Sequence, residues 1–286
     1  MLPAGVGQLR RPVLIAAFEG WNDAGDAASG AVEHLELTWD ARKVFALEPD
    51  EFYDFQVNRP MVSGGQGGQG GPGEPRRITW PTTRVSVCTP AGSARDVVLV
   101  RGLEPNMRWR AFCTELLAVG AELGTELVVT LGALLADNPH TRPVPVSGSA
   151  SDPAVARALG LERSRYEGPT GIVGVFGDES AKSGVGVVSL WARVPHYVAA
   201  PPCPKATLAL LRRVEDLLEI TVPLGELPEQ ARRWERSVDE MAAEDSEVRE
   251  YITSLEQREP ETDLPEASGE AIAREFERYL ERGGDS

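Results

Sequence analysis

The sequence has few cysteines and no long hydrophobic run, and each shortage excludes a class of protein. Its three cysteines, Cys88, Cys113 and Cys203, form neither a disulfide framework nor a C-x-x-C metal motif. Unpaired cysteines are typical of a reducing compartment, so we expect a cytoplasmic protein. No apolar stretch reaches the roughly 20 residues of a membrane span. The run at 13–18 leads directly into Glu19 without a cleavage site, so we predict no signal peptide.

Positive charge is also scarce, with 29 basic against 44 acidic residues and a net charge of −15. Nucleic acids and anionic membranes bind clustered Lys and Arg, so we expect neither as a partner. The acidity is concentrated in residues 225–286, which carry 19 acidic and 8 basic side chains, a net charge of −11. We therefore predict a core at 1–224 and an acidic helical arm at 225–286, because Pro223 and Gly225 interrupt helix continuation between them.

A glycine-rich stretch, SGGQGGQGGPG at 63–73, interrupts the predicted core. Glycine loses the most backbone entropy on ordering, so we expect a flexible insertion here. The stretch matches G-x-G-x-x-G, but that motif binds dinucleotides only between a strand and a helix. Low-complexity sequence on both sides excludes that interpretation.

The rest of the core alternates between two kinds of apolar pattern. Continuous runs at 13–18, 43–47, 84–89, 97–101, 126–131 and 185–190 favour strands buried on both faces. Helical spacing of apolar residues occupies 24–37, 108–123 and 205–220. The alternation predicts a three-layer α/β/α sandwich with a mostly parallel or mixed sheet. A further strand around 78–80 would make the sheet mixed.

The arm is predicted to be helical throughout. A 4-3 spacing, interrupted at Asp245, is typical of a coiled-coil seam and makes these residues interface candidates: Trp234, Val238, Met241, Val248, Ile252 and Leu255. A second short helix would place Ile272, Phe276, Tyr279 and Leu280 on one face. Two interpretations stay open, an arm packed on its own core and an arm that contacts a partner or another subunit.

Ligands of open α/β sheets bind beyond the carboxyl ends of the strands, and polar side chains follow the strand at 13–18. Glu19, Trp21, Asn22 and Asp23 lie in this first segment. One interpretation is a helix cap, with Asn22 or Asp23 accepting hydrogen bonds from the next helix. The alternative is a binding site, where carboxylates would repel phosphate and receive a cation or an amine.

Two later segments have the same position relative to their strands. Asp137, His140 and Arg142 follow the strand at 126–131, and His196 with Tyr197 follows the strand at 185–190. We expect the two histidines to face one crevice; the alternative is that they only satisfy nearby carbonyl groups. No H-x-x-x-H or H-x-x-E-H spacing is present, so we predict no metal and no cofactor.

No catalytic set is legible in the sequence. The segment 146–150, VSGSA, lacks the glycines of a G-x-S-x-G elbow. The segment 177–183, GDESAKS, has Ala181 where a phosphate-binding loop needs its second glycine. Catalytic residues therefore cannot be assigned from motifs.

Four motifs together resemble the proteasome assembly chaperone family, in its branch from high-G+C Gram-positive bacteria. They are FEGWNDAG at 18–25, PHTRP at 139–143, YEGPTGI at 166–172 and SLWARVPHY at 189–197. The resemblance runs from about Pro12 to Leu255, with the glycine-rich stretch as an insertion. It implies a phosphorylase/hydrolase-like α/β/α core and a homo-oligomer, with a trimer as one option.

The resemblance also implies a non-enzymatic assembly or protein-interaction factor, with proteasome subunits or another protein as partner. Family members that dock on proteasome rings often end in a hydrophobic–Tyr–any tripeptide. This sequence ends in ERGGDS, so we expect no docking through such a tail. The alternative hypothesis is a small-molecule-binding or hydrolase-like enzyme with its site at the carboxyl ends of the strands.

Overall fold

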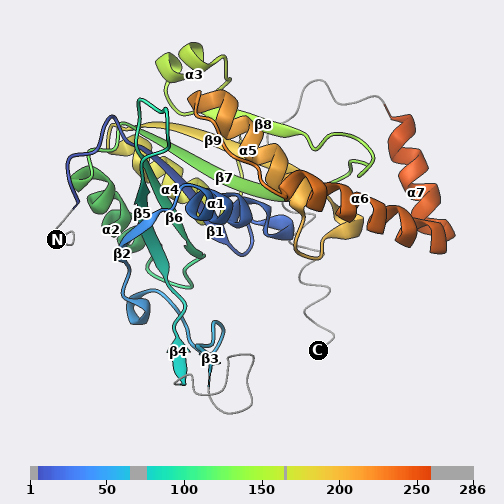
Figure 1. Ribbon diagram of the computed structural model, residues 1–286, viewed down its shortest axis with the longest axis horizontal. Helices are drawn as coiled ribbons and strands as arrows, with labels where there is room; N and C mark the ends of the chain where they lie inside the picture. Colours follow the sequence, from blue (N-terminus) through green and yellow to red (C-terminus); the bar gives the residue numbers. More distant parts are fainter. Residues whose placement is uncertain (1–5, 65–75, 164–165, 259–286) are drawn as a thin grey trace.

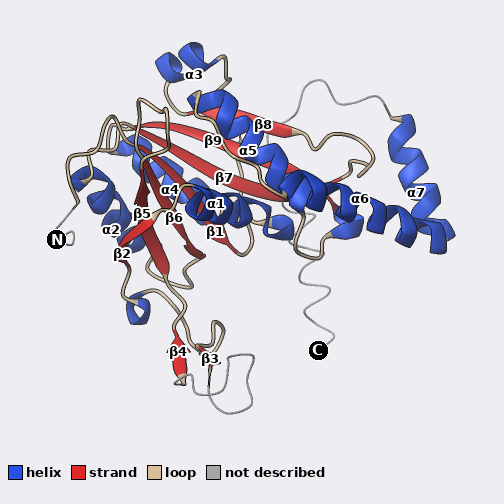
Figure 2. Cartoon of the chain, viewed as in Figure 1, coloured by secondary structure: helices blue, strands red, loops and turns tan. Residues whose placement is uncertain are grey.

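The computed structural model describes residues 6–64, 76–163 and 166–258, which form a seven-stranded sheet with helices on both faces (Figures 1 and 2). The strand order is β2-β5-β6-β1-β7-β9-β8. The strands of this sheet are β1 (Val13–Glu19), β2 (Arg42–Ala46), β5 (Thr83–Cys88), β6 (Val97–Leu103), β7 (Leu127–Ala136), β8 (Val146–Ala150) and β9 (Gly186–Pro195). The predicted α/β/α fold class is therefore confirmed.

The centre of the sheet is parallel and its edges are antiparallel. Strands β6, β1, β7 and β9 pair in parallel, β2 and β5 continue the sheet antiparallel beyond β6, and β8 pairs antiparallel with β9. All six predicted strand runs coincide with strands of the sheet. Continuous apolar sequence marks these strands because helices cover both faces.

Successive residues of β1 enter two different cores. Val13, Ile15 and Ala17 pack against α1 (Ala27–Thr38) and α5 (Pro204–Leu218). On the opposite face, Leu14 and Phe18 pack against α2 (Trp109–Glu122) and α4 (Ile172–Lys182). The alternation follows from the two-residue period of a strand. Three short helical turns, η1 (Ala24–Asp26), η2 (Pro49–Glu51) and η3 (His196–Val198), lie in connecting segments.

The sequence patterns above do not predict three elements of the core. They are β8, the short helix α3 (Pro153–Leu159), and α4. The segment compared above with a phosphate-binding loop begins inside α4, at Gly177. Gly177 faces β9, where an added Cβ would be in ordinary contact, 3.6 Å from Val187 Cγ1.

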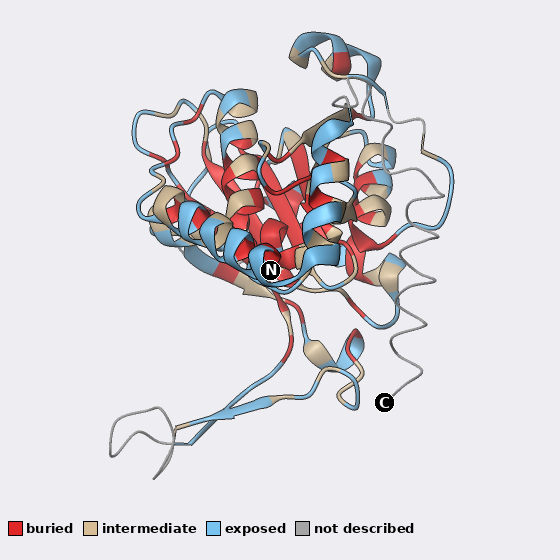
Figure 3. Cartoon of the chain, turned by 90° about the vertical axis from the view of Figure 1, so that its right-hand side faces the viewer, coloured by how far each residue is buried: buried red, intermediate tan, exposed pale blue. Residues whose placement is uncertain are grey.

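A small hairpin projects from the main body and is exposed along its length (Figure 3). It consists of β3 (Met61–Ser63) and β4 (Arg77–Thr79), which pair only with each other. The strand expected around 78–80 therefore does not join the main sheet, and the mixed character comes from β2, β5 and β8. Of the predicted glycine-rich insertion, residues 65–73 lie outside the described residues.

The described part of the arm contains two helices, α6 (Leu227–Glu244) and α7 (Ser246–Gln257). The prediction that the arm is helical throughout is wrong at Asp245, where the predicted seam is interrupted. This residue is extended, with φ −118° and ψ 113°, and the chain turns there. The Asp245 side chain accepts hydrogen bonds from the backbone N–H groups of Glu247 and Val248 and so caps α7. The helix predicted around 272–280 lies outside the described residues. Among those described, no helix is long and apolar enough to cross a membrane.

Close strand packing at Gly102 gives a first test of this fold. Gly102 of β6 lies opposite Thr83 of β5, and a Cβ at Gly102 would come within 2.4 Å of the Thr83 Cα. We expect Gly102→Ala to lower the free energy of unfolding by about 1–3 kcal/mol, because neighbouring backbone must move. Urea denaturation measures this change. Gly177→Ala in α4 is the control, and alanine's helix propensity should leave it equal or more stable by up to about 1 kcal/mol. Equal midpoints for Gly102→Ala and wild type would contradict the prediction.

Candidate functional site

The second and third polar segments meet at one edge of the sheet. Strands β7 and β9 pair in register up to Ala136 and Pro195, so the segments that follow them leave the sheet side by side. His140 and Tyr197 are brought into contact there, with ring centroids 5.8 Å apart. The ring of His196 lies 5.9 Å from that of Tyr197. Both histidines therefore face the same tyrosine.

The His140 side chain is buried and both of its ring nitrogens have partners. Nδ1 lies 2.8 Å from the Tyr197 hydroxyl, and Nε2 lies 3.0 Å from Asp239 Oδ1 on α6. The same hydroxyl accepts a hydrogen bond from the His140 backbone N–H at 2.6 Å. A consistent arrangement has Tyr197 donating to Nδ1 and Nε2–H donating to Asp239. The imidazole thus joins the β7 loop to the arm and has no nitrogen left for a ligand.

The rings of His196 and Tyr251 lie around Tyr197, beside its hydrogen bond to His140. Tyr251 of α7 packs edge-on against His196, with centroids 5.2 Å apart, and lies 6.1 Å from Tyr197. Burial raises the pKa of Tyr197 to about 12, so the phenol stays protonated and able to donate. His196 Nδ1 lies 3.2 Å from Asp137 Oδ1, but without the alignment of a hydrogen bond.

Arg142 also contacts the arm. Its guanidinium donates to the backbone carbonyls of Glu256 and Arg258, at the carboxyl end of α7. Carbonyl groups at a helix end lack intrahelical partners, and a cation there also complements the helix dipole. Thr141 adds a hydrogen bond to Glu256 Oε1 at 2.6 Å. The polar loop after β7 therefore binds α7.

Lys205, at the start of α5, completes these contacts. Its ammonium donates to the His140 carbonyl oxygen and to Glu235 Oε1 of α6 at 2.5 Å. Sequence reasoning missed Lys205, Asp239 and Tyr251. The arm was interpreted only through its apolar spacing, and nothing in the sequence indicates which polar residues of the arm reach the core.

The first polar segment is used differently. Asp23 is buried, and its Oδ1 accepts hydrogen bonds from the backbone N–H groups of Ala28 at 2.6 Å and Ser29 at 3.2 Å. These contacts bear out the interpretation of Asp23 as a cap for the following helix. The Trp21 indole Nε1 and Asn22 Oδ1 are buried without a hydrogen-bond partner among the described residues.

Two glutamates, one in this segment and one beside it, are also partly buried. Glu19 lies 3.7 Å from Arg101, and burial raises its pKa. Glu104, which follows β6, accepts a hydrogen bond from Ile172 N at 2.9 Å, at the start of α4. Burial raises the pKa of Glu104 as well. Sequence reasoning missed Glu104, whose role depends on where α4 begins.

The first segment does not share hydrogen bonds with the other two. Ala133 of β7 donates to the Asn22 carbonyl, which fixes the first segment at that level of the sheet. The second segment begins beyond Ala136, about 10 Å further along at the rise of a strand. Within the described residues, no hydrogen bond or ion pair joins Glu19, Trp21 or Asp23 to the histidines. The predicted polar residues thus form two groups.

The interface candidates of the arm differ in exposure. Val238, Ile252 and Leu255 are buried within the chain, Trp234 and Val248 are partly buried, and Met241 is exposed. Trp234 packs at the margin of the core that contains α5. Much of the seam is therefore covered by the chain's own residues.

Burial also determines the protonation state of the cysteine thiols. The thiols of Cys88, Cys113 and Cys203 are buried, which raises their pKa to about 12, 12 and 11. They stay protonated at neutral pH and pack as apolar groups. In the part of the chain that the structure describes, no three His, Cys, Asp or Glu side chains are placed to hold a metal ion.

Comparison with known proteins identifies the family. The model of the PAC2 family matches residues 17–242. The chain belongs to the PAC2 family. The match includes both polar groups and most of α6, and it ends before α7. No protein of curated function matches the chain.

Solved PAC2 structures agree with this assignment. A PAC2 family protein from Streptomyces avermitilis is 60% identical, with a TM-score of 0.77, over 84% of this chain and 99% of that one. A proteasome-assembly chaperone homologue from Mycobacterium tuberculosis is 56% identical, with a TM-score of 0.75 and the same coverage. An archaeal proteasome activator from Pyrococcus furiosus shares the fold alone, at 17% identity and a TM-score of 0.64 over 82% of this chain and 95% of that one. The resemblance predicted from the four motifs is confirmed.

Burial of Asp23 predicts a pH dependence in this PAC2 protein. Its pKa is about 6, against an ordinary 3.8. The folded state thus binds this proton more tightly than the unfolded state, so the contribution of Asp23 to stability should rise as pH falls from 7 to 4.5. The gain is at most about 3 kcal/mol. Asp23→Asn abolishes this titration, so the difference in unfolding free energy between variant and wild type should change with pH.

Chemical denaturation at pH 7 and pH 4.5 measures that difference. Asp50→Asn, at an exposed position, is the matched control and should differ from wild type by the same amount at both values. A pH-independent difference for Asp23→Asn would show that burial of this carboxyl does not perturb its titration.

The hydrogen bonds of Arg142 predict that this residue stabilises α7. Arg142→Ala removes two charge-assisted hydrogen bonds from the end of the helix, so we expect hydrogen exchange of the α7 amides to become about tenfold faster. The control is Arg236→Ala, which removes an exposed arginine that pairs only within α6, with Glu229. Equal exchange rates in the two variants would mean that Arg142 does not hold α7.

Proposed function

We propose that this PAC2 protein is a non-enzymatic assembly factor that acts through protein–protein contacts on a proteasome-related partner. The observation that carries the proposal is the 56% identity to a proteasome-assembly chaperone homologue over nearly all of that chain. The geometry of the polar residues supports it. The polar atoms of His140 and Asp23 form hydrogen bonds within the chain, as those of structural residues do.

The β3–β4 hairpin is the surface that we assign to these contacts. Met61, Ile78 and Trp80 are 69%, 52% and 47% exposed, and Trp80 packs only partly, against Phe55 with centroids 4.9 Å apart. Clustered apolar side chains on a projecting element are typical of a protein interaction site. A two-stranded hairpin is marginally stable alone, and contact with a partner would stabilise it.

The proposal includes self-association and a cytoplasmic location. A homo-oligomer, with a trimer as one option, would bury part of the exposed apolar surface. Three buried free thiols fit a reducing compartment. The acidic arm at 225–286 is proposed to be a unit distinct from the core at 1–224.

The partner proposal is tested by affinity purification of the tagged full-length protein from its native cell, with quantitative mass spectrometry. We expect proteasome subunits to be enriched over an untagged control, and Met61→Ser with Ile78→Ser to reduce that enrichment about tenfold. Leu37→Ser is the matched control, because Leu37 is an exposed apolar residue at the end of α1. Light scattering on the same proteins tests self-association.

Absence of proteasome subunits from the wild-type sample would overturn the partner assignment. Full enrichment with the hairpin variant would overturn the hairpin as the contact surface. A wild-type mass equal to that of one chain would overturn self-association.

A further inference from the structure

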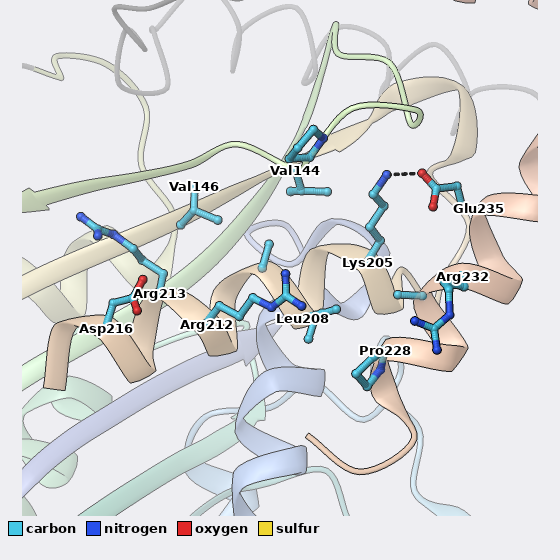
Figure 4. Close-up of a pocket in the computed structure, with 13 residues that line it drawn as sticks. Val144, Val146, Lys205, Leu208, Arg212, Arg213, Asp216, Pro228, Arg232 and Glu235 are labelled. Carbon is cyan, nitrogen blue, oxygen red and sulfur yellow. Dashed lines mark hydrogen bonds and ion pairs between the residues drawn. The ribbon is translucent and has the colours of Figure 1, made fainter. Parts of the chain in front are cut away.

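A groove of about 430 Å³ runs between the segment before β8, helix α5 and helix α6 (Figure 4). Its apolar lining includes Val144, Val146 and Leu208. Arginines stand around it, with Arg212 and Arg213 on α5 and Arg232 on α6. The groove therefore combines an apolar floor with a margin in which basic side chains outnumber the acidic Asp216 and Glu235.

Two of these arginines have no acidic partner among the described residues. Arg232 pairs with Glu229, and Lys205 at the groove's end pairs with Glu235. Arg212 is exposed and Arg213 partly buried, and neither forms an ion pair. Both lie beside the apolar lining of the groove. They fit an acidic, amphipathic occupant.

The described part of the chain ends near this groove. Arg142 donates to the carbonyls of Glu256 and Arg258, so the described chain ends beside Arg142. The next residue, Pro143, lines the groove. The last described residue, Arg258, therefore contacts the sequence neighbour of a groove-lining residue.

The sequence of this segment complements the groove. Residues 259–286 carry nine acidic and three basic side chains, a net charge of −6. In a helix, Ile272, Phe276, Tyr279 and Leu280 would share one face. Residues 259–271 separate this face from Arg258, and 13 extended residues span up to about 45 Å. Length therefore does not restrict docking.

We propose that the acidic segment 259–286 of the same chain occupies this groove. The apolar face that begins at Ile272 covers Val144, Val146 and Leu208, and the segment's carboxylates pair with Arg212 and Arg213. Exposed ion pairs contribute little individually, so apolar burial supplies most of the affinity. Tethering adds an effective concentration in the millimolar range. The inference is independent of the proposed proteasome-related function.

Disulfide trapping in the full-length protein tests the contact. Ala209→Cys places a thiol in the groove, and Ala273→Cys places one at the edge of the predicted apolar face. The matched control pairs Ala209→Cys with Arg274→Cys, one residue further on and on the opposite face. The three natural cysteines are buried and should not react. We expect the Ala273→Cys pair to cross-link about tenfold faster, giving a product with the mass of one chain.

Charge reversal tests the basic margin. Arg212→Glu with Arg213→Glu should slow cross-linking of the Ala273→Cys pair about tenfold, since the segment would then face like charges. Arg110→Glu, at an exposed site on α2 behind the sheet, should leave the rate unchanged. If the double reversal lowers the melting temperature, Arg212→Gln with Arg213→Gln replaces it, with an intermediate slowing expected.

Three results would overturn the proposal. Products with the mass of two chains only would make a second copy the occupant. Equal rates for Ala273→Cys and Arg274→Cys would mean that the predicted apolar face does not enter the groove. Unchanged rates after both changes at Arg212 and Arg213 would remove charge complementarity as the cause.

Discussion

The pairing of β7 with β9 is the constraint on which the rest of this PAC2 structure depends. The two strands stay in register for ten residue pairs, from Leu127 with Gly186 to Ala136 with Pro195. Strand β1 accompanies β7 for only four pairs, up to Ala16 with Thr130. Strands β7 and β9 therefore extend beyond the centre of the sheet. Their extension separates the loop of His140 from the polar segment that follows β1.

An extended strand pair would leave its end open to water, and the arm covers it. Asp239 reaches His140 from α6, Tyr251 packs on His196 from α7, and Glu235 pairs with Lys205. Each contact joins a polar or aromatic group of the core to one of the arm. Single exposed ion pairs stabilise little, but the His140 side chain is 1% exposed, and losing its partner would leave a buried polar group unpaired. Hydrogen bonds and ion pairs therefore position the arm, in addition to the burial of its apolar side chains.

Much of the core could be predicted from the sequence because its elements have local signals. Continuous apolar runs located β1, β5, β6 and the first halves of β7 and β9. Strand β8, with the sequence VSGSA, has no such run, since it is a partly exposed edge strand whose pairing with β9 defines it. Helix α4 was missed because Gly174 and Gly177 weaken its helical signal. An added Cβ at Gly174 would meet Thr170 Oγ1 at 2.0 Å, whereas Gly177 has room for one.

The polar sites also differ in whether local sequence or only tertiary contacts reveal their roles. Asp23 caps a helix five residues ahead, and His140 and His196 follow neighbouring strands, so spacing and topology indicated both arrangements. Asp239 lies 99 residues from His140, and its role exists only once α6 has docked on α5. The 4-3 apolar spacing around Asp245 continues across the break, so it could not show that this aspartate begins a new helix.

The match to the PAC2 family ends within the arm, inside α6. The matched residues, 17–242, contain His140, Tyr197 and Asp239, whereas Tyr251 and Glu256 lie beyond them. The hydrogen-bonded chain through His140 is therefore built entirely from residues within the match. The aromatic and polar contacts of α7 are added to it from outside, over the same end of β7 and β9. The net charge of −11 in residues 225–286 belongs to the part of the chain that covers this edge, and Lys205 and Arg142 are the core cations that hold it there.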